Sequence, residues 1–475
     1  MTQIDQIMQQ AATACEQYKK IPPAQRAAFL EAIGAEITAR REVLVKTAGE
    51  ETNLPMARLN GEIVRTTTQL QKFADLVKEG SWVEAVIDTK PNIRRMLVPV
   101  GPVVVFGASN FPFAFSTAGG DTASALAAGA TVVVKAHPAH PRTSQTMFEA
   151  IQAAIVQSGM PAHTVQHVTG DYHTGKALVI HPFTTGVGFT GSLQGGKALC
   201  AYAAEREVPI PVFAEMSSVN PVVFLPQALE TRGAELAETF AASITLGAGQ
   251  FCTNPGLLIG LESPAFTAFQ QQLGAALEKT PPQKMLHPGI HTAFLEGRTR
   301  MLAHQEVSLS PKPVPDFDTN AVRPSLALTS GAALLANPAL KEEVFGPHAL
   351  VVACKDKAEL LAVLKGLKGQ LTTSLMATEE DLAQWREVID IQVTLAGRII
   401  LNGAPTGVEV CAAMVHGGPF PATTDARFTS VGTAAIRRWV RPVCYQQFPD
   451  ALLPDELKDG NPRGIWRLTD NQYAR

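Results

Sequence analysis

The residue whose type and setting suggest chemistry most directly is Cys252. It lies in the run Gly249-Gln250-Phe251-Cys252, after a long helix that we predict to end near Ala248. Glycines in such a turn let the backbone approach a ligand, and a free thiol in an accessible turn can act as a nucleophile. The alternative for a single cysteine is a small buried hydrophobic residue. We assign that structural role to the other cysteines: Cys15, Cys200, Cys354, Cys411 and Cys444.

Two polar side chains come directly after predicted buried strands. Glu215 ends the predicted strand 212–215, and Asn110 follows the predicted strand 103–106. Desolvation of a carboxylate raises its pKa toward that of a general base, although Glu215 could instead cap the following helix. The Asn110 amide could donate to a developing oxyanion, or it could form an Asx turn ahead of Pro112. The residues alone leave these alternatives open.

Three further residues are placed to contact a nucleotide. Lys135 ends the predicted strand 131–135 and could reach a ribose or a phosphate. Ser192 and Gly196 lie in a glycine-rich loop that leads from a strand into a helix, whose free N–H groups favour a pyrophosphate. The loop lacks the G-x-G-x-x-G fingerprint, so a simple tight turn is the alternative. His137 and His140 have no third ligand nearby in the sequence, and we predict no metal site.

These side chains need parallel strands to bring them together. From Pro102 onward, short β-branched runs alternate with small-residue helical segments, which is typical of βαβ units. The predicted strands are 103–106, 131–135, 164–168, 186–189 and 212–215, and the helices between them are 118–128, 142–158 and 195–204. Such a doubly wound sheet binds its ligand at the carboxyl ends of its strands.

Other segments indicate a second α/β unit and an arm. The second series begins near Asn220, and its predicted strands are 222–225, 257–259, 349–354, 371–376 and 398–401. Residues 4–78 have helical periodicity throughout, with a break at Pro22 and Pro23. Residues 83–97 predict a hairpin or an extended arm, and the segment beyond Val440 predicts a tail or arm that wraps another surface.

The composition excludes several classes of protein. The chain has 475 residues, with 40 Lys and Arg against 43 Asp and Glu, so it has no general electrostatic drive toward nucleic acid. Its longest apolar stretch, 96–108, is interrupted by prolines and glycines and is too short to cross a membrane. The scattered cysteines and the polar, signal-free residues 1–10 predict a cytoplasmic protein with reduced thiols.

Taken together, the motifs resemble the aldehyde dehydrogenase superfamily from Ala27 to the C-terminus. The matching positions are Asn110-Phe111-Pro112, Lys135, 189–192, Glu215 with Asn220-Pro221, 249–252, 343–347 and Asn402-Gly403. The resemblance implies an α/β fold with a Rossmann-type cofactor domain, an α/β catalytic domain and a small β oligomerisation arm. It assigns 1–80 and 100–216 to the cofactor domain, 217–440 to the catalytic domain, and 81–99 and 441–475 to the arm and C-terminal tail.

The same resemblance implies residue roles. Cys252 attacks the aldehyde, Asn110 and the Cys252 N–H hold the oxyanion, and Glu215 activates the water that hydrolyses the thioester. Glu343 binds the nicotinamide ribose and Phe345 packs beside it. Ser192 and Gly196 match pyrophosphate-side positions, and Lys135 matches a position at the adenosine ribose. The family's β-arm implies a homodimer or a homotetramer.

The cofactor and the substrate follow from finer features. NAD-preferring relatives commonly have a Glu three residues after the lysine, whereas this chain has Pro138, with Lys135, His137 and Arg142 close in sequence. We therefore predict NADP over NAD, with NAD possible. The runs 405–410 and 416–425 are similar to the 2-oxoglutarate semialdehyde (2,5-dioxopentanoate) dehydrogenase branch, which also includes NADP-dependent fatty aldehyde dehydrogenases. The alternatives are a broad-specificity or fatty aldehyde dehydrogenase, a CoA-acylating enzyme and a non-catalytic homologue.

Overall fold

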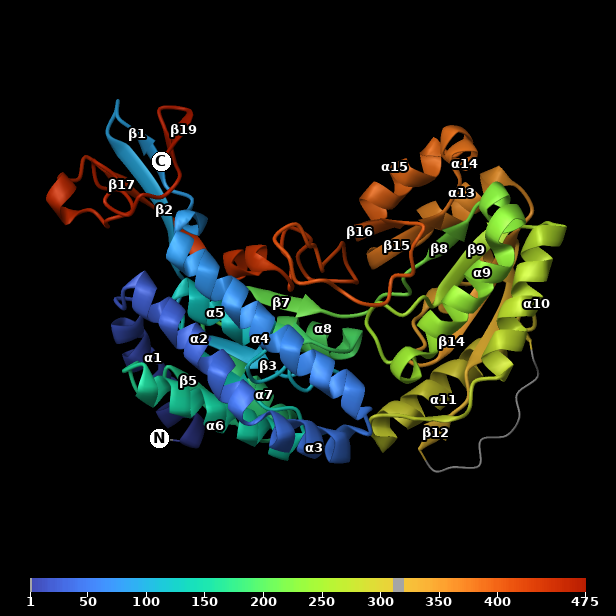
Figure 1. The fold of residues 1–475 in the computed structure, drawn as a ribbon, viewed down its shortest axis with the longest axis horizontal. Helices are drawn as coiled ribbons and strands as arrows, with labels where there is room; N and C mark the ends of the chain where they lie inside the picture. Colours follow the sequence, from blue (N-terminus) through green and yellow to red (C-terminus); the bar gives the residue numbers. More distant parts are fainter. Residues whose placement is uncertain (1, 311–319) are drawn as a thin grey trace.

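The computed structural model describes residues 2–310 and 320–475. Two α/β units lie side by side, and a small third sheet projects from the first of them (Figure 1). The chain builds the first unit, crosses to the second and then returns. Strands from its C-terminal part therefore pair with residues 86–99 (Figure 1).

The chain begins with four helices, so the predicted helical character is confirmed, but the breaks after Ala39 and Thr52 were not predicted. The helices are α1 (Gln3–Tyr18), α2 (Pro23–Ala39), α3 (Arg41–Thr52) and α4 (Met56–Glu79). Pro23 occupies the first turn of α2, where its missing N–H costs no helical hydrogen bond. The predicted break at Pro22 and Pro23 is confirmed.

The first sheet is parallel and has the order β5-β4-β3-β6-β7. Its strands are β3 (Val103–Phe106), β4 (Val132–Lys135), β5 (Val165–Val168), β6 (Gly186–Thr190) and β7 (Val212–Glu215). All five predicted strands are confirmed to within one residue at each end. The helices of this unit that follow its strands are α5 (Gly120–Ala128), α6 (Pro141–Gln157), α7 (Tyr172–Ile180) and α8 (Leu193–Ala204).

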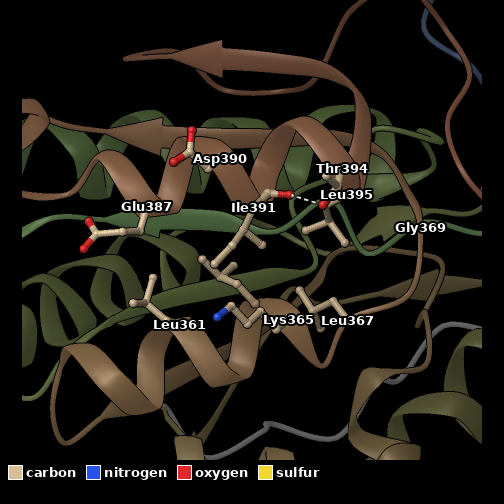
Figure 2. A pocket seen from close by; sticks show the side chains of 10 residues that line it. Leu361, Lys365, Leu367, Gly369, Glu387, Asp390, Ile391, Thr394 and Leu395 are labelled. Atoms are coloured by element: carbon tan, nitrogen blue, oxygen red, sulfur yellow. Dashed lines mark hydrogen bonds between the residues drawn. The ribbon is translucent and has the colours of Figure 1, made fainter.

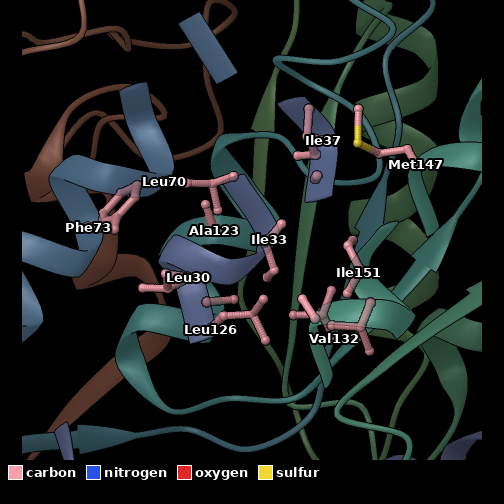
Figure 3. Packing of buried hydrophobic residues seen from close by; sticks show 14 of the residues in the cluster. Leu30, Ile33, Ile37, Leu70, Phe73, Ala123, Leu126, Val132, Met147 and Ile151 are labelled. Carbon is pink, nitrogen blue, oxygen red and sulfur yellow. The ribbon is translucent and has the colours of Figure 1, made fainter. Parts of the chain in front are cut away.

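Two helices that precede the first sheet and one that follows β3 share one hydrophobic core. Leu30 and Ile33 of α2, Leu70 and Phe73 of α4, and Leu126 of α5 pack together over the sheet (Figure 3). The chain returns to this core near its end, since Ala435, Ile436 and Trp439 of the 3-10 helix η4 (Thr433–Trp439) are buried in the same cluster. The Trp439 Nε1–H donates to Ser124 Oγ at 2.8 Å, which fixes the C-terminal segment on α5.

The second sheet has the order β11-β13-β14-β9-β8-β15-β16 and is parallel except for the β11–β13 pair. Its strands are β8 (Val222–Phe224), β9 (Leu257–Leu261), β11 (Ser308–Leu309), β13 (Ser325–Ser330), β14 (His348–Cys354), β15 (Gln370–Met376) and β16 (Ala396–Leu401). The five predicted strands of this unit are confirmed, whereas β11 and β13 were not predicted.

Helices cover this second sheet, and one minor strand pair lies beside it. The helices are α9 (Pro226–Thr245), α10 (Pro264–Glu278), α11 (Pro288–Leu302), α12 (Gly331–Ala336), α13 (Lys357–Lys365), α14 (Glu379–Gln384) and α15 (Arg386–Leu395). The pair is formed by β10 (Gln283–Lys284) and β12 (Ala321–Val322).

The third sheet joins two segments that are far apart in the sequence. Its order is β17-β2-β1-β18-β19, with β1 (Val86–Asp88), β2 (Ile93–Pro99), β17 (Val440–Gln446), β18 (Arg467–Thr469) and β19 (Gln472–Ala474). The predicted hairpin is confirmed by the antiparallel β1–β2 pair, and the C-terminal segment wraps onto it. Among residues 2–310 and 320–475, no helix combines the length and the apolar character needed to cross a bilayer.

Candidate active site

Cys252 lies in a loop that only a glycine-rich sequence can form. Helix α9 ends at Thr245, and Gly247, Ala248 and Gly249 then adopt left-handed backbone conformations. A Cβ at Gly249 would lie 2.3 Å from the Gly346 carbonyl oxygen, so glycine is required for this close approach. The loop therefore packs directly on the segment that contains the predicted cofactor residues Glu343 and Phe345.

A buried amide holds the other side of the cysteine loop. Asn220 Nδ2 donates to the carbonyl oxygens of Cys252 (2.9 Å) and Asn254 (2.8 Å). Its Oδ1 accepts from Ser218 Oγ and from Thr372 Oγ1, so its side chain is fixed on both sides. The Cys252 thiol is consequently presented from a rigid loop, and it is only half-buried.

Glu215 and His416 lie against the thiol. Glu215 ends β7 and is 3% exposed, and its Oε1 is 2.9 Å from His416 Nε2. The same Nε2 is 3.4 Å from Cys252 Sγ, while Ser430 Oγ donates to Glu215 Oε2 at 2.8 Å. One ligand-type atom of each of the three residues lies within 4.8 Å of the others. We call Cys252, Glu215 and His416 the reactive cluster.

The reactive cluster places a protonated thiol next to an ionised carboxylate. Burial, together with the nearby Glu215 carboxylate, raises the pKa of Cys252 well above that of an ordinary thiol. Burial also acts to raise the pKa of Glu215, but His416 and the hydroxyl of Ser430 outweigh it and hold that pKa below its usual value. A thiol and an ionised base are thus adjacent, as nucleophilic catalysis by cysteine requires.

The sequence did not identify His416 as a site residue. It appears only as the first residue of the run 416–425, with no spacing that links it to Cys252 or Glu215. The position of His416 is set by tertiary structure. Its backbone N–H donates to Thr429 Oγ1 at 2.9 Å, and the segment folds back onto β7. A lone histidine beside glycines in a polar loop is the signal that could have suggested it. Thiol, imidazole and carboxylate can also bind metals, so the expectation of no metal stays a prediction.

Asn110 lies beside the cysteine loop, as the predicted oxyanion role needs. It follows β3, and its Nδ2 donates to the Gln250 carbonyl oxygen at 3.1 Å. Its side chain is 8% exposed, and one Nδ2 hydrogen is left for another acceptor. Gln250 Oε1 in turn accepts from the Leu286 N–H, so the loops that contain Asn110 and Cys252 share one hydrogen-bond network.

Three of the predicted cofactor residues, Lys135, Ser192 and Gly196, lie at the carboxyl edge of the first sheet. Lys135 ends β4, next to β3, and burial lowers its pKa. Ser192 is the N-cap of α8, where its Oγ accepts from the Gly195 N–H at 3.1 Å. A Cβ at Gly196 would be 2.4 Å from Met216 Sδ, so this helix start packs closely on the strand end. The exposed N-terminus of a twelve-residue helix at this edge fits the pyrophosphate of a dinucleotide.

Glu343 and Phe345 lie in the segment that packs against Gly249 of the cysteine loop. Glu343 Oε2 accepts from Ser217 Oγ at 2.7 Å, and burial raises the pKa of Glu343 to about 7. Both Glu343 and Phe345 line a small cavity with Gly249 and Ser218. Glu343 is therefore held by a hydroxyl in this structure and has no cationic partner among the described residues.

Two of the three basic residues cited for NADP contribute little free positive charge. Arg142 is paired with Glu50 (3.2 Å) and Glu51 (3.4 Å). Burial, with smaller effects from His140, His287 and Lys135, lowers the pKa of His137 to about 3, so this imidazole is neutral near pH 7. Of these three residues, Lys135 is the one that is charged and forms no ion pair with another described residue, so the positive charge expected from His137 and Arg142 is largely absent.

A different hollow lies on the second unit. It is a groove between α13 and α15, lined by apolar side chains such as Leu361 and Ile391, with Lys365 and Glu387 at its rim (Figure 2). It contains none of the residues described above, so it is separate from the candidate active site.

The sequence family follows from these features and from direct comparison. Residues 1–294 match the model of the "Aldehyde dehydrogenase family". The chain belongs to this family, and it is an oxidoreductase that acts on an aldehyde with a nicotinamide dinucleotide, NAD or NADP.

Two relatives and one solved structure are similar to this chain over almost its whole length. The chain is 47% identical to alpha-ketoglutaric semialdehyde dehydrogenase 2 of Azospirillum brasilense, over 99% of this chain and 91% of the relative. It is also 47% identical to alpha-ketoglutaric semialdehyde dehydrogenase of Acinetobacter baylyi, with the same coverage. Its fold matches a double mutant of betaine aldehyde dehydrogenase from Staphylococcus aureus in complex with NAD+, with a TM-score of 0.80 and 18% identity, over 94% of this chain and 89% of the other.

Proposed function

We propose that this enzyme oxidises 2,5-dioxopentanoate, the semialdehyde of 2-oxoglutarate, to 2-oxoglutarate. The observation that carries the proposal is the contact of His416 Nε2 with both Cys252 Sγ and Glu215 Oε1, in a chain nearly half identical to two dehydrogenases of that semialdehyde. The proposed site of action is a reducing cytoplasm, where Cys252 stays a thiol.

The first chemical step needs a base. Because the pKa of Cys252 is raised well above its usual value, its thiol is protonated near neutral pH. His416 and Glu215 together accept that proton, since Nε2 contacts both the sulfur and the carboxylate. The thiolate then forms a bond to the aldehyde carbon, and the new oxyanion accepts from the Asn110 amide and the Cys252 N–H.

The second half of the reaction regenerates the thiol. A dinucleotide held by Lys135, Ser192, Gly196, Glu343 and Phe345 would supply the hydride acceptor, and loss of hydride would leave the former aldehyde carbon as a thioester of Cys252. Glu215 is held ionised by His416 and Ser430, and it takes a proton from the water that attacks the thioester. The proton taken from the thiol in the first step leaves to solvent before the water is activated. Collapse of the intermediate then gives the acid and the Cys252 thiolate, which takes back the proton held by Glu215, while the acid loses its own proton to solvent. Overall, the aldehyde, water and the oxidised dinucleotide give the carboxylate, the reduced dinucleotide and two protons.

We also propose NADP as the preferred cofactor. Pro138 stands where NAD-preferring relatives commonly have a glutamate, and Lys135 at the end of β4 supplies a positive charge near the adenosine ribose. A carboxylate at that position would repel a 2′-phosphate, and Pro138 cannot. The measurement is the ratio of kcat/KM values for NADP and NAD, and a tenfold preference for NAD would overturn this proposal.

The third sheet is proposed to join subunits into a homodimer or a homotetramer. Around it, Tyr473 (75% exposed), Leu452 (70%) and Trp466 (50%) present apolar surface that a partner could cover. Light scattering of the purified enzyme measures its mass directly. A monomer at micromolar concentration would contradict the proposal.

The substrate test compares two five-carbon aldehydes with a longer one. Production of reduced cofactor is followed with 2,5-dioxopentanoate, pentanal and hexanal. The proposal expects the highest kcat/KM with 2,5-dioxopentanoate. A preference for hexanal and longer aldehydes would favour the fatty aldehyde alternative, and turnover that requires coenzyme A would favour the acylating one.

A further inference from the structure

One face of helix α4 points toward the reactive cluster. Arg58, Glu62 and Arg65 are spaced four and three residues apart, so they lie on the same side of this helix. We call these three residues the arginine face. Glu62 is 4% exposed, and its Oε1 accepts from the N–H groups of Phe113 (2.8 Å) and Ala114 (2.9 Å). The arginine face is thereby anchored to the loop that begins at Asn110.

Arg58 is used to connect the loops of the site. Its Nη2 donates to the Asn110 carbonyl oxygen at 2.6 Å. Its guanidinium carbon lies 4.9 Å from the ring centroid of Phe111 and 4.6 Å from that of Phe251. Arg58 therefore links the Asn110 loop to the Cys252 loop, which is a positioning role.

Arg65 lies further along the same face and, like Arg58, has one bonded nitrogen and two buried nitrogens without a partner, but the unbonded pair is a different one. Its Nη1 donates to the Val408 carbonyl oxygen, but its Nε and Nη2 are buried and have no hydrogen-bond partner. In a guanidinium, Nε–H and Nη2–H are parallel and form the fork that holds both oxygens of a carboxylate. The two unbonded nitrogens of Arg65 are this pair.

The fork of Arg65 lies close to the reactive cluster. Its guanidinium carbon is 5.4 Å from the ring centroid of Phe115, and that ring is 6.2 Å from the imidazole ring of His416. Burial lowers the pKa of Arg65, and the neighbouring groups Cys252, Glu62, Glu409 and Glu215 act against this effect. None of these carboxylates bonds to Nε or Nη2, so both N–H groups of the fork are buried without a partner in the free enzyme.

Arg398 is a useful contrast, because it also lies near Cys252. Its Nη1 and Nη2 donate to the carbonyl oxygens of Gly407 (2.8 Å) and Pro405 (2.5 Å), which leaves only Nε unbonded. A carboxylate could not bind it side-on without displacing a backbone carbonyl. Arg398 therefore supports the segment 405–407, whereas Arg65 keeps its fork free.

We propose that Arg65 binds the carboxylate at the far end of the substrate, and so selects short aldehydes that are acids at the other end. This inference rests on the proposed function for the choice of 2,5-dioxopentanoate, in which three carbons separate the aldehyde carbon from the carboxylate. A buried, unbonded guanidinium is costly in the free enzyme, and a substrate carboxylate removes that cost. A neutral aldehyde such as pentanal gains nothing from it.

The main test compares Arg65→Met with the unaltered enzyme on 2,5-dioxopentanoate and on pentanal. Loss of a charge-assisted bond pair lowers kcat/KM for the acid about 10- to 100-fold, mainly through KM, and leaves pentanal within about twofold. Arg65→Lys keeps the charge without the fork and recovers part of the loss. Arg398→Met is the matched control, and it changes kcat/KM for both aldehydes by the same factor.

A second measurement does not depend on turnover or on the identity of the substrate. Cys252 is alkylated with iodoacetate, which is anionic, and with iodoacetamide, which is neutral, and modification of the Cys252 peptide is followed by mass spectrometry. Arg65→Met lowers the iodoacetate-to-iodoacetamide rate ratio by about tenfold if Arg65 attracts a carboxylate to the thiol. Thermal unfolding of each variant establishes that the fold is retained.

The outcomes separate the two proposals. If the unaltered enzyme prefers pentanal to 2,5-dioxopentanoate, the proposed function fails, while the alkylation ratio still tests Arg65 by itself. If Arg65→Met lowers both substrates equally, or leaves both the acid and the alkylation ratio unchanged, the assignment of Arg65 is overturned.

Discussion

The reactive cluster and the arginine face border the same loops but differ in how completely their polar atoms are bonded. Both oxygens of Glu215 and the Cys252 thiol have partners within the protein, from segments around residues 215, 252, 416 and 430, and His416 Nδ1 is the one buried polar atom of the cluster without a partner. Arg65, in contrast, comes from a single helix and has two buried N–H groups without a partner. The chemistry is thus organised before the substrate arrives, whereas recognition of its charged end is completed by the substrate itself.

The largest expected effect comes from removing the centre of the reactive cluster. Cys252→Ala lowers dehydrogenase activity by at least about 10³-fold, because no other described side chain occupies the position of the nucleophile. The assay is production of reduced cofactor with saturating aldehyde. Cys444→Ala is the matched control, since this thiol is exposed on β17. Activity that survives Cys252→Ala would break the comparison, because the cluster would then not be the reactive end.

Removing the base should divide the reaction into its two halves. Glu215→Gln keeps a hydrogen-bond acceptor for His416 but cannot take a proton from water, so turnover falls about 10²- to 10⁴-fold. If thioester formation survives, rapid mixing shows one burst of reduced cofactor per Cys252, followed by slow turnover. If turnover stays fast after the first equivalent of reduced cofactor has formed, another group activates the water.

His416 tests whether the cluster is a bonded unit or a set of neighbours. His416→Gln removes the imidazole that contacts both Cys252 and Glu215, and we expect kcat to fall about 10²-fold. The rate at which iodoacetamide modifies Cys252 should fall as well, and it should recover at higher pH, where hydroxide deprotonates the thiol. An unchanged alkylation rate would restrict His416 to a packing role.

The smallest expected effect concerns Glu343, whose bonding is intermediate between the two regions. Its pKa is about 7 because it is buried, and only the ionised form accepts strongly from ribose hydroxyls. Cofactor binding should therefore tighten as pH rises from 6 to 8, by up to about tenfold, with the Kd measured by fluorescence titration. Glu343→Gln should remove this dependence. Equal pH dependence in the variant would show that another group titrates.

Local patterns predicted most of the scaffold for definite reasons. Runs such as Val103–Phe106 are too short and too β-branched for helices, and the small residues of α5 suit a helix that packs closely on a sheet. The helix α7 (Tyr172–Ile180) was not predicted, because its nine residues end in an apolar run that is equally typical of a strand. Strand β13 (Ser325–Ser330) was missed because serine and threonine interrupt its alternation.

The sequence by itself determined which side chains follow strands or begin helices, and so it identified Cys252, Glu215, Asn110 and Ser192 as candidates. It did so because strand ends and helix starts are fixed by neighbouring residues, within a few positions along the chain. The four-residue spacing of Arg58 and Glu62 is equally local, but it does not predict which residues this face of α4 contacts. Only the tertiary structure brings His416 to Cys252 and Arg65 to Phe115, because these contacts depend on how distant segments pack against one another.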